Sequence, residues 1–273
     1  MSITAKDVNE LRKKTGAGMM DCKKALQESK GDVEAAIDFL RKKGQKIAAK
    51  RGDREAKEGL VIAKSSGNFG YIVCLNCETD FVAKNNDFGN LANSLLDLAI
   101  NTSSTSLDDF MAQDFPGSDL SVSAKITEQS GVIGEKIEIS AFEMINAEKV
   151  VAYNHPGNQI ASLVGLTLDA EEEGKQVAMQ VAAMNPIALD QDAVPQDIID
   201  REIEIGKDLA IQEGKPVEMA EKISKGRLNK FFKETTLVNQ SFIRDNKKTV
   251  GQFLKDTDPD LKVTDFKRYS LSI

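Results

Sequence analysis

The chain has 273 residues, 41% of them hydrophobic, which is enough for one large domain or two to three small domains with packed cores. Its net charge of −7, its 5% aromatic content and its lack of tryptophan argue against a protein that binds nucleic acid directly by charge or base stacking. No signal pattern opens the chain and no apolar run approaches the roughly 18 residues of a membrane span, so we expect no membrane contact and a cytoplasmic location.

Residues 3–43 predict three short helices, with a break at Gly16-Ala-Gly18 between the first two. Met19 and Met20 follow this break. Because adjacent helical residues cannot both face one core, at least one of the two methionines should be displayed. The charged segment 45–58 is expected to be a solvated, helical linker.

A hairpin of two strands, 60–64 and 69–75, is predicted next, and a helix over 88–100 follows it. The segment 77–84 connects them. Connections of this kind run over the surface, so Phe81 in this segment is a candidate contact for a partner. The alternative is that Phe81 folds back as a hydrophobic staple ahead of the helix.

The middle of the chain predicts a second set of elements in a similar order. The segment 101–121 reads as a loop with one helical turn near Phe110. The predicted elements after it are a helix over 122–129 that ends at Ser130-Gly131, strands over 136–144, 150–153 and 160–168, and a helix over 171–184. Val132 and Ile133 form an apolar bump between glycines or, alternatively, the start of a strand. The repeated order of strand, turn, strand, loop and helix suggests two related α+β halves.

The last part of the chain predicts a helical hairpin over 186–225, with a turn at Gly214-Lys-Pro216. Its apolar stripe either forms the seam inside the hairpin or also pairs with another molecule. A short helix over 249–255 and a strand over 263–271 close the chain.

No constellation of catalytic residues is evident. Cys74 and Cys77 form a C-x-x-C pair, but a zinc site would need Cys22 and His155 as well, and residues three apart on a strand point to opposite faces. Buried thiols are the expected state, with no metal ion and no cofactor, and a thiol enzyme is the weakest alternative. The single histidine, His155, sits in a His-Pro-Gly turn with no nucleophile beside it.

The distinctive residues are instead apolar side chains on turns, namely Met19, Met20, Phe81 and Ile133. A few apolar anchors carry most of the affinity in many protein interfaces. This pattern favours a protein-binding function over an enzymatic one.

Two long segments, Leu11–Leu26 and Asn76–Lys84, resemble the two signature segments of the elongation factor Ts family. The similarity continues through Gly226-Arg-Leu228 and Lys248-Thr-Val-Gly251, and so covers essentially the whole chain. Members of this family are the nucleotide exchange factors of elongation factor Tu, the GTPase that carries aminoacyl-tRNA to the ribosome.

The resemblance implies an α+β protein with an N-terminal three-helix ubiquitin-associated-like domain, a two-part α+β core with antiparallel sheets, and a helical-hairpin insertion. The boundaries expected here are 1–53 for the helical domain, 54–139 for the first core subdomain, 140–185 with 226–273 for the second, and 186–225 for the hairpin. In some members this hairpin mediates dimerisation, so a homodimer through it is an open possibility.

The resemblance also implies which residues contact the partner. The loop that presses into the GTPase domain near the Mg²⁺ site corresponds to Thr79, Asp80, Phe81 and Val82. The N-terminal surface that contacts the same domain corresponds to Arg12, Met19 and Met20. A further contact turn corresponds to Ile133 and Gly134, and His155 matches a contact to another domain of the partner.

The function implied is that of a translation elongation factor, not an enzyme. It would bind elongation factor Tu in the GDP-bound and nucleotide-free forms and promote GDP release by disturbing the Mg²⁺ and phosphate site, so that GTP can enter. The alternative is a ubiquitin-associated-type adaptor that binds a protein without exchange activity.

Overall fold

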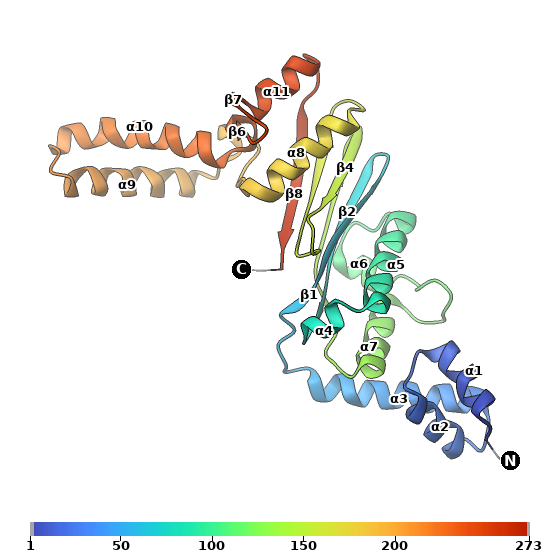
Figure 1. Ribbon diagram of the computed structural model, residues 1–273. Coiled ribbons are helices and arrows are strands. Elements are labelled where there is room, and N and C mark those ends of the chain that lie inside the picture. Colours follow the sequence, from blue (N-terminus) through green and yellow to red (C-terminus); the bar gives the residue numbers. More distant parts are fainter. Residues whose placement is uncertain (1–2, 272–273) are drawn as a thin grey trace. The chain divides into compact units, whose positions relative to one another are not determined.

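The computed structural model describes residues 3–271, and its helices and antiparallel strands confirm the α+β class (Figure 1). The chain forms two compact units. The first unit comprises the residues up to Ile62 together with Val73–Phe142, and the second comprises Ala63–Ile72 and Glu143–Ser270. Within residues 3–271, no helix is both long and apolar enough to cross a membrane.

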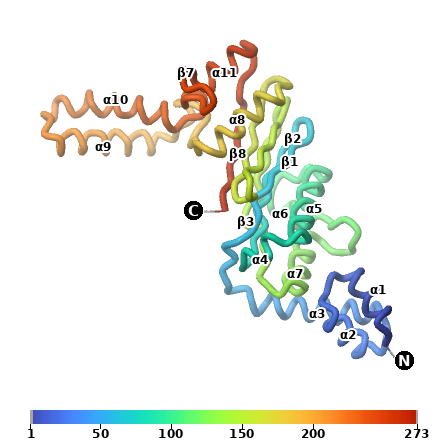
Figure 2. The backbone as a smooth tube through the Cα atoms, viewed as in Figure 1, coloured from blue at the N-terminus to red at the C-terminus, as the bar shows by residue number. Residues whose placement is uncertain are grey.

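Three helices open the first unit: α1 (Ala5–Thr15), α2 (Met19–Glu28) and α3 (Val33–Arg51). They pack together at the blue end of the tube (Figure 2), around a core that includes Leu11, Cys22, Leu26 and Ala36. The first half of the predicted linker, 45–51, belongs to α3, which continues to Arg51. Its helical character is confirmed for that half only. Residues 52–57 separate α3 from the next strand, which begins at Glu58.

The elements of the sheet and helices that follow are β1 (Glu58–Ser66), β2 (Phe69–Cys77), α4 (Asp80–Ala83), α5 (Asn86–Thr102), α6 (Leu107–Ala112), α7 (Val122–Ile133) and β3 (Glu138–Asn146). The three strands form a sheet in the order β1-β2-β3. Asn85 caps α5, since its side chain accepts a hydrogen bond from the backbone N–H of Asp87, and the apolar stripe of α5 is buried. The helical turn predicted near Phe110 is α6.

The predicted end of α7 at Ser130-Gly131 is wrong, because the helix runs on to Ile133. Gly131 lies inside the helix, where it packs against Gly44 of α3. Gly134 ends the helix instead. It adopts a left-handed conformation with φ of 83°, and its N–H bonds to the carbonyl of Ser130. Val132 and Ile133 are therefore the last turn of a helix, not a flexible bump or a strand start.

The second unit contains an antiparallel sheet in the order β4-β5-β8, made of Lys149–Asn154, Ile160–Leu166 and Val263–Ser270. Helix α8 (Glu171–Met184) packs on this sheet, and Val164, Val177 and Val181 belong to one buried core. Gly174 permits the close approach, since a methyl group there would lie 2.5 Å from a side-chain carbon of Val151.

The helical hairpin consists of α9 (Gln196–Gln212) and α10 (Val217–Thr235), which lie side by side (Figure 1). Its seam is made of small residues: Gly206 lies against Ser224, and Ala210 and Ala220 are buried. The apolar stripe predicted for the hairpin contributes less to this seam than expected, since Leu209 is 42% exposed. The boundary expected at 225/226 falls inside α10.

The second unit also contains shorter elements, one just before the hairpin and the others after it. They are the 3-10 turns η1 (Gln191–Ala193) and η2 (Leu237–Asn239), the strands β6 (Ser241–Phe242) and β7 (Asp245–Thr249), and helix α11 (Val250–Thr257). Phe242 and Phe253 stack here with their ring centres 4.3 Å apart, which ties β6 to α11.

Candidate functional site

Phe81 is displayed on the surface. Its side chain is 83% exposed, so the staple alternative, in which the ring packs ahead of α5, is contradicted. The segment that carries it is not an open loop but the single helical turn α4, none of whose residues is buried. At this exposure the ring gains little from its own fold, so it is available for a contact with another molecule.

The carboxylate and ammonium groups of α4 pair within the turn. Lys84 Nζ lies 2.6 Å from Asp80 Oδ2, one helical turn away. The hydrogen bond from Lys84 holds the pKa of Asp80 below its ordinary value. Asp80 is therefore ionised at neutral pH and is ready to bond a partner or to keep the turn closed.

The N-terminal end of α4 is attached to the end of α7. Glu135 accepts hydrogen bonds from the backbone N–H groups of Glu78 and Thr79, each at 3.0 Å, and from the Thr79 hydroxyl at 2.6 Å. Thr79 uses its hydroxyl in this way rather than to cap α4. The turn that presents Phe81 thus has its base fixed from a distant part of the chain.

A groove of about 420 Å³ runs beside the turn. It lies between the end of α1, the connection from α4 to α5, and the last turn of α7. Its lining residues are Gly16, Val82, Asn85, Asp87, Phe88, Gln129, Val132 and Ile133. Two of the predicted contact residues, Val82 and Ile133, therefore face one concave surface of the first unit.

The methionines after the Gly16-Ala-Gly18 turn are both displayed: Met19 is 53% exposed and Met20 74%. Arg12 is also exposed, on α1. Ala17 and Cys22, on either side of the methionines, are buried in the helical core, so the backbone that carries the methionines is anchored.

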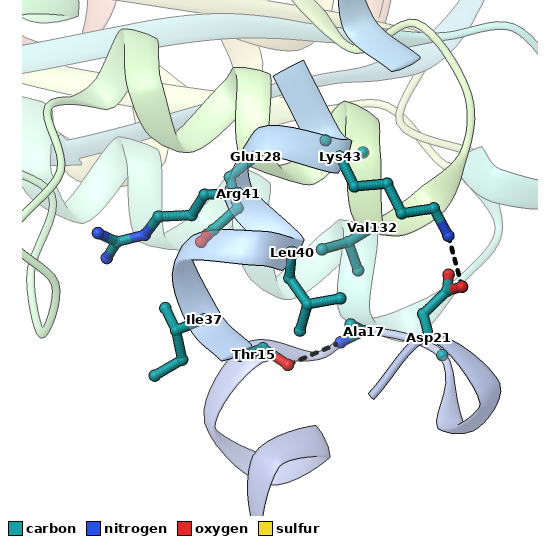
Figure 3. Close-up of a pocket in the computed structure, with 12 residues that line it drawn as sticks. Thr15, Ala17, Asp21, Ile37, Leu40, Arg41, Lys43, Glu128 and Val132 are labelled. Carbon is teal, nitrogen blue, oxygen red and sulfur yellow. Dashed lines mark hydrogen bonds and ion pairs between the residues drawn. The ribbon is translucent and has the colours of Figure 1, made fainter. Parts of the chain in front are cut away.

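A small cavity separates this end of the helical bundle from α7. Figure 3 shows Leu40, Ala17 and Val132 around it, with Asp21 and Lys43 pointing toward one another. The ion pair of Asp21 and Lys43 links α2 to α3 beside the exposed methionines.

The remaining predicted contacts lie in different settings. Ile133 and Gly134 are half-buried at the end of α7. His155 belongs to the second unit, where it is exposed in the turn after β4, and its Nδ1 lies 3.2 Å from the Tyr153 hydroxyl. All of the predicted contacts except His155 therefore belong to the first unit, and two of them, Val82 and Ile133, line one groove.

The cysteines are buried and poorly suited to chemistry. Burial raises the pKa of Cys74, and burial together with the nearby Glu135 carboxylate raises the pKa of Cys77 to about 12. Thiols of this kind are not nucleophiles at neutral pH, which argues against the thiol-enzyme alternative. Across residues 3–271, no group of three His, Cys, Asp or Glu side chains is placed to hold a metal ion.

Sequence reasoning missed Glu78, Glu135 and Gly131 as parts of this surface. Glu78 stands inside a quoted signature segment, and Glu135 follows Gly134 directly. Neither position carries a local signal, because the bonds that matter join residues 56 and 57 apart in the chain.

Comparison with known proteins gives the family of this chain. A family model described as "Elongation factor TS" matches residues 78–272. The elongation factor Ts of Christiangramia forsetii is 54% identical over 98% of both chains, and that of Flavobacterium psychrophilum is 50% identical over 99% of both. The elongation factor Ts of Amoebophilus asiaticus is 50% identical over 98% of both chains.

These matches place the protein among the translation elongation factors. The chain belongs to the elongation factor Ts family.

Proposed function

We propose that this protein binds elongation factor Tu, in its GDP-bound and nucleotide-free forms, and promotes the release of GDP. The observation that carries the proposal is Phe81, a large apolar ring held 83% exposed on a turn whose base is fixed by Glu135. The groove next to it adds Val82 and Ile133. Met19 and Met20 add further exposed apolar side chains to the same unit.

The proposed mechanism follows from how a GTPase holds its nucleotide. Mg²⁺ bridges the phosphates, so displacing the surroundings of the metal weakens the hold on GDP. Phe81 would supply the apolar wedge, with Asp80 bonding the partner or holding the turn, and Thr79 and Val82 on either side. By thermodynamic reciprocity, bound GDP must weaken the binding of this protein by the same factor by which this protein weakens GDP binding.

The other predicted contacts would serve to hold the partner while the wedge acts. Arg12, Met19 and Met20 would bind the same domain of the GTPase, with Ile133 and Gly134 nearby. His155, exposed in the second unit, would bind a further domain. In this mechanism no covalent bond is made or broken, so the protein acts as an exchange factor and not as an enzyme. Its proposed location is the cytoplasm.

The hairpin offers a second possible contact, to another copy of this chain. Ile205, Leu209, Val217 and Met219 are all at least 40% exposed on α9 and α10. The alternative of a homodimer through residues 186–225 is supported by these exposed apolar side chains and would appear in the molar mass in solution.

The test is the release of a fluorescent GDP analogue from elongation factor Tu, followed by stopped flow. Phe81→Ala should slow the accelerated release at least tenfold, because the wedge is lost. Ile243→Ala, which truncates a 46% exposed apolar side chain of the second unit, is the matched control and should release GDP like the wild type. Binding without any acceleration by the wild type would instead favour the adaptor alternative.

A further inference from the structure

Glu78 and Glu135 each accept hydrogen bonds from backbone N–H groups of the segment in which the other glutamate lies. Glu135 accepts from the N–H groups of Glu78 and Thr79, and the carboxylate of Glu78 accepts from the N–H of Lys136 at 2.6 Å. The junction between β2 and α4 is thus joined to the junction between α7 and β3 by bonds in both directions. Bonds to a carboxylate are the stronger class of hydrogen bond.

The carboxylate of Glu78 also receives the end of α3. Arg51 and Arg54 lie 2.6 Å and 3.1 Å from its two oxygens. Burial by itself would raise the pKa of Glu78, but the hydrogen bonds from Arg51, the Lys136 N–H and Arg54 outweigh it and lower the pKa to about 2. Glu78 is therefore ionised at neutral pH and holds Lys136, the residue after Glu135, in place.

Helix α4 has little stability of its own. It has four residues, none of them buried, and no side chain caps its first turn. Isolated helices much shorter than about 12 residues are not stable in water, because nucleation is unfavourable. Within the turn, the Asp80–Lys84 ion pair is exposed, and exposed pairs contribute little to stability. The bonds that Glu135 accepts from Glu78 and Thr79, the two residues before α4, therefore supply support from outside the turn that holds Asp80 and Phe81.

We propose that Glu135 is a positioning residue for nucleotide exchange. Its carboxylate fixes the base of α4, so that Phe81 stands outward in one orientation before the partner arrives. The inference rests on the proposed function for its kinetic consequence, but the ordering of the turn is a property of this chain alone.

The expected kinetic effect depends on the step in which the free energy of ordering the α4 turn is spent. Without Glu135, the partner must order the turn when it binds, and this lowers the apparent affinity. Phe81 is still present, so the release rate at saturation is retained. A residue that made the wedge itself would lower that saturating rate instead.

Glu135→Gln is the test variant, because it keeps the size of the side chain but removes its charge. The bonds from the N–H groups of Glu78 and Thr79 then become weaker neutral bonds, and the new NH₂ group faces the Thr79 hydroxyl, which has to accept a hydrogen bond instead of donating one. In the GDP-release assay it should raise the half-saturating concentration about 5- to 30-fold and leave the maximal rate within about twofold. Thr79→Val, which removes only the hydroxyl bond, should shift the same parameter less. Glu138→Gln is the matched control. Its half-exposed carboxylate, three residues away, pairs with the Lys136 ammonium and has no bond to Glu78 or Thr79 among those described, so the substitution should change neither parameter.

A double-mutant cycle separates positioning from direct contact. If Glu135 acts only through Phe81, Glu135→Gln should have no further effect in a Phe81→Ala background. Equal effects in both backgrounds would overturn the proposal, since Glu135 would then act by a route that does not involve the ring. A Glu135→Gln variant with wild-type kinetics would also overturn it.

A fluorescence measurement on the protein alone tests the ordering of the turn without elongation factor Tu. The chain has no tryptophan, so Phe81→Trp places a single reporter at the tip of the turn. Adding Glu135→Gln should lower its fluorescence anisotropy, while adding Glu138→Gln should not. Unchanged anisotropy in a folded Glu135→Gln protein, checked by circular dichroism, would overturn the proposal. A loss of anisotropy in a protein that does not accelerate GDP release would instead refute only the proposed function.

Discussion

Gly44 and Gly131 meet backbone to backbone where α3 crosses α7, but the two positions are not equivalent. A methyl group on Gly131 would lie 2.1 Å from the Cα of Gly44, whereas one on Gly44 would lie 3.4 Å from the Cα of Gly131. This crossing joins the helical bundle that carries Met19 and Met20 to the helix that ends at Ile133.

The difference between the two distances predicts different losses of stability for two alanine substitutions. Gly131→Ala should destabilise the first unit by about 2 kcal/mol or more, because overpacking forces the two backbones apart. Gly44→Ala should change stability by less than about 1 kcal/mol, since its close contact is offset by the higher helix propensity of alanine. Denaturant unfolding of both variants measures the difference, and equal losses would contradict the crossing as described.

Exposure predicts that Phe81 contributes nothing to stability. Phe81→Ala should change the free energy of unfolding by less than about 0.5 kcal/mol. Phe88→Ala, seven residues away, should cost about 3–5 kcal/mol, because that side chain is only 2% exposed. Thermal and denaturant unfolding test the pair. A large loss of stability in Phe81→Ala would show that the ring packs against its own chain.

The lowered pKa of Glu78 predicts that the free energy of unfolding depends on pH in the acid range. The pKa is about 2 in the folded protein against an ordinary value of 4.5, so the folded state favours the ionised form. This stabilisation is present above pH 4.5 and is lost as the pH falls toward 2. Its size is on the order of 2 kcal/mol, after allowing for partial solvent screening of the arginines.

Glu78→Gln is the variant that isolates this contribution. It should be less stable than the wild type at pH 7, and the difference should shrink as the pH falls from about 4.5 to 2, because the wild-type carboxylate then takes up a proton. Urea unfolding at several pH values measures it. A difference that stays constant across this range would show that the Arg51 and Arg54 ion pairs do not set the pKa.

Burial predicts that Cys74 and Cys77 are unreactive in the folded protein. Both side chains are 0% exposed, and the pKa of Cys77 is raised to about 12. Ellman's reagent should label them at least about 100-fold more slowly in the native protein than in guanidinium. A Cys74→Ser, Cys77→Ser double variant that folds should keep its effect on GDP release, and loss of that effect would revive the thiol alternative.

Several elements of the fold were predictable from local pattern. The helix over 171–184 has the bounds that were predicted, and the helix predicted over 88–100 is present as α5. The display of Met19 or Met20 followed from helix geometry alone, because adjacent residues point in different directions. For Phe81, its position after a strand allowed either an exposed ring or a ring packed ahead of α5. Only the tertiary structure decided between them, in favour of the exposed ring.

The end of α7 was predicted wrongly for an instructive reason. Gly131 looks like a helix terminator, since glycine lowers helix stability and favours left-handed caps. In the structure, its missing side chain serves the crossing with Gly44, and the neighbouring Gly134 is the terminator. Two glycines three residues apart carry the same local signal, so tertiary packing has to distinguish them.

The sequence alone was enough for the α+β class, the order of the main elements, the family resemblance and the display of at least one of Met19 and Met20. These depend on periodicity, capping and short motifs, which act between residues close together in the chain. The tertiary structure decided that Phe81 is exposed, that Glu78 and Glu135 hold its turn, and that Gly131 is a packing residue. These depend on contacts between segments more than fifty residues apart, and no local pattern encodes such contacts.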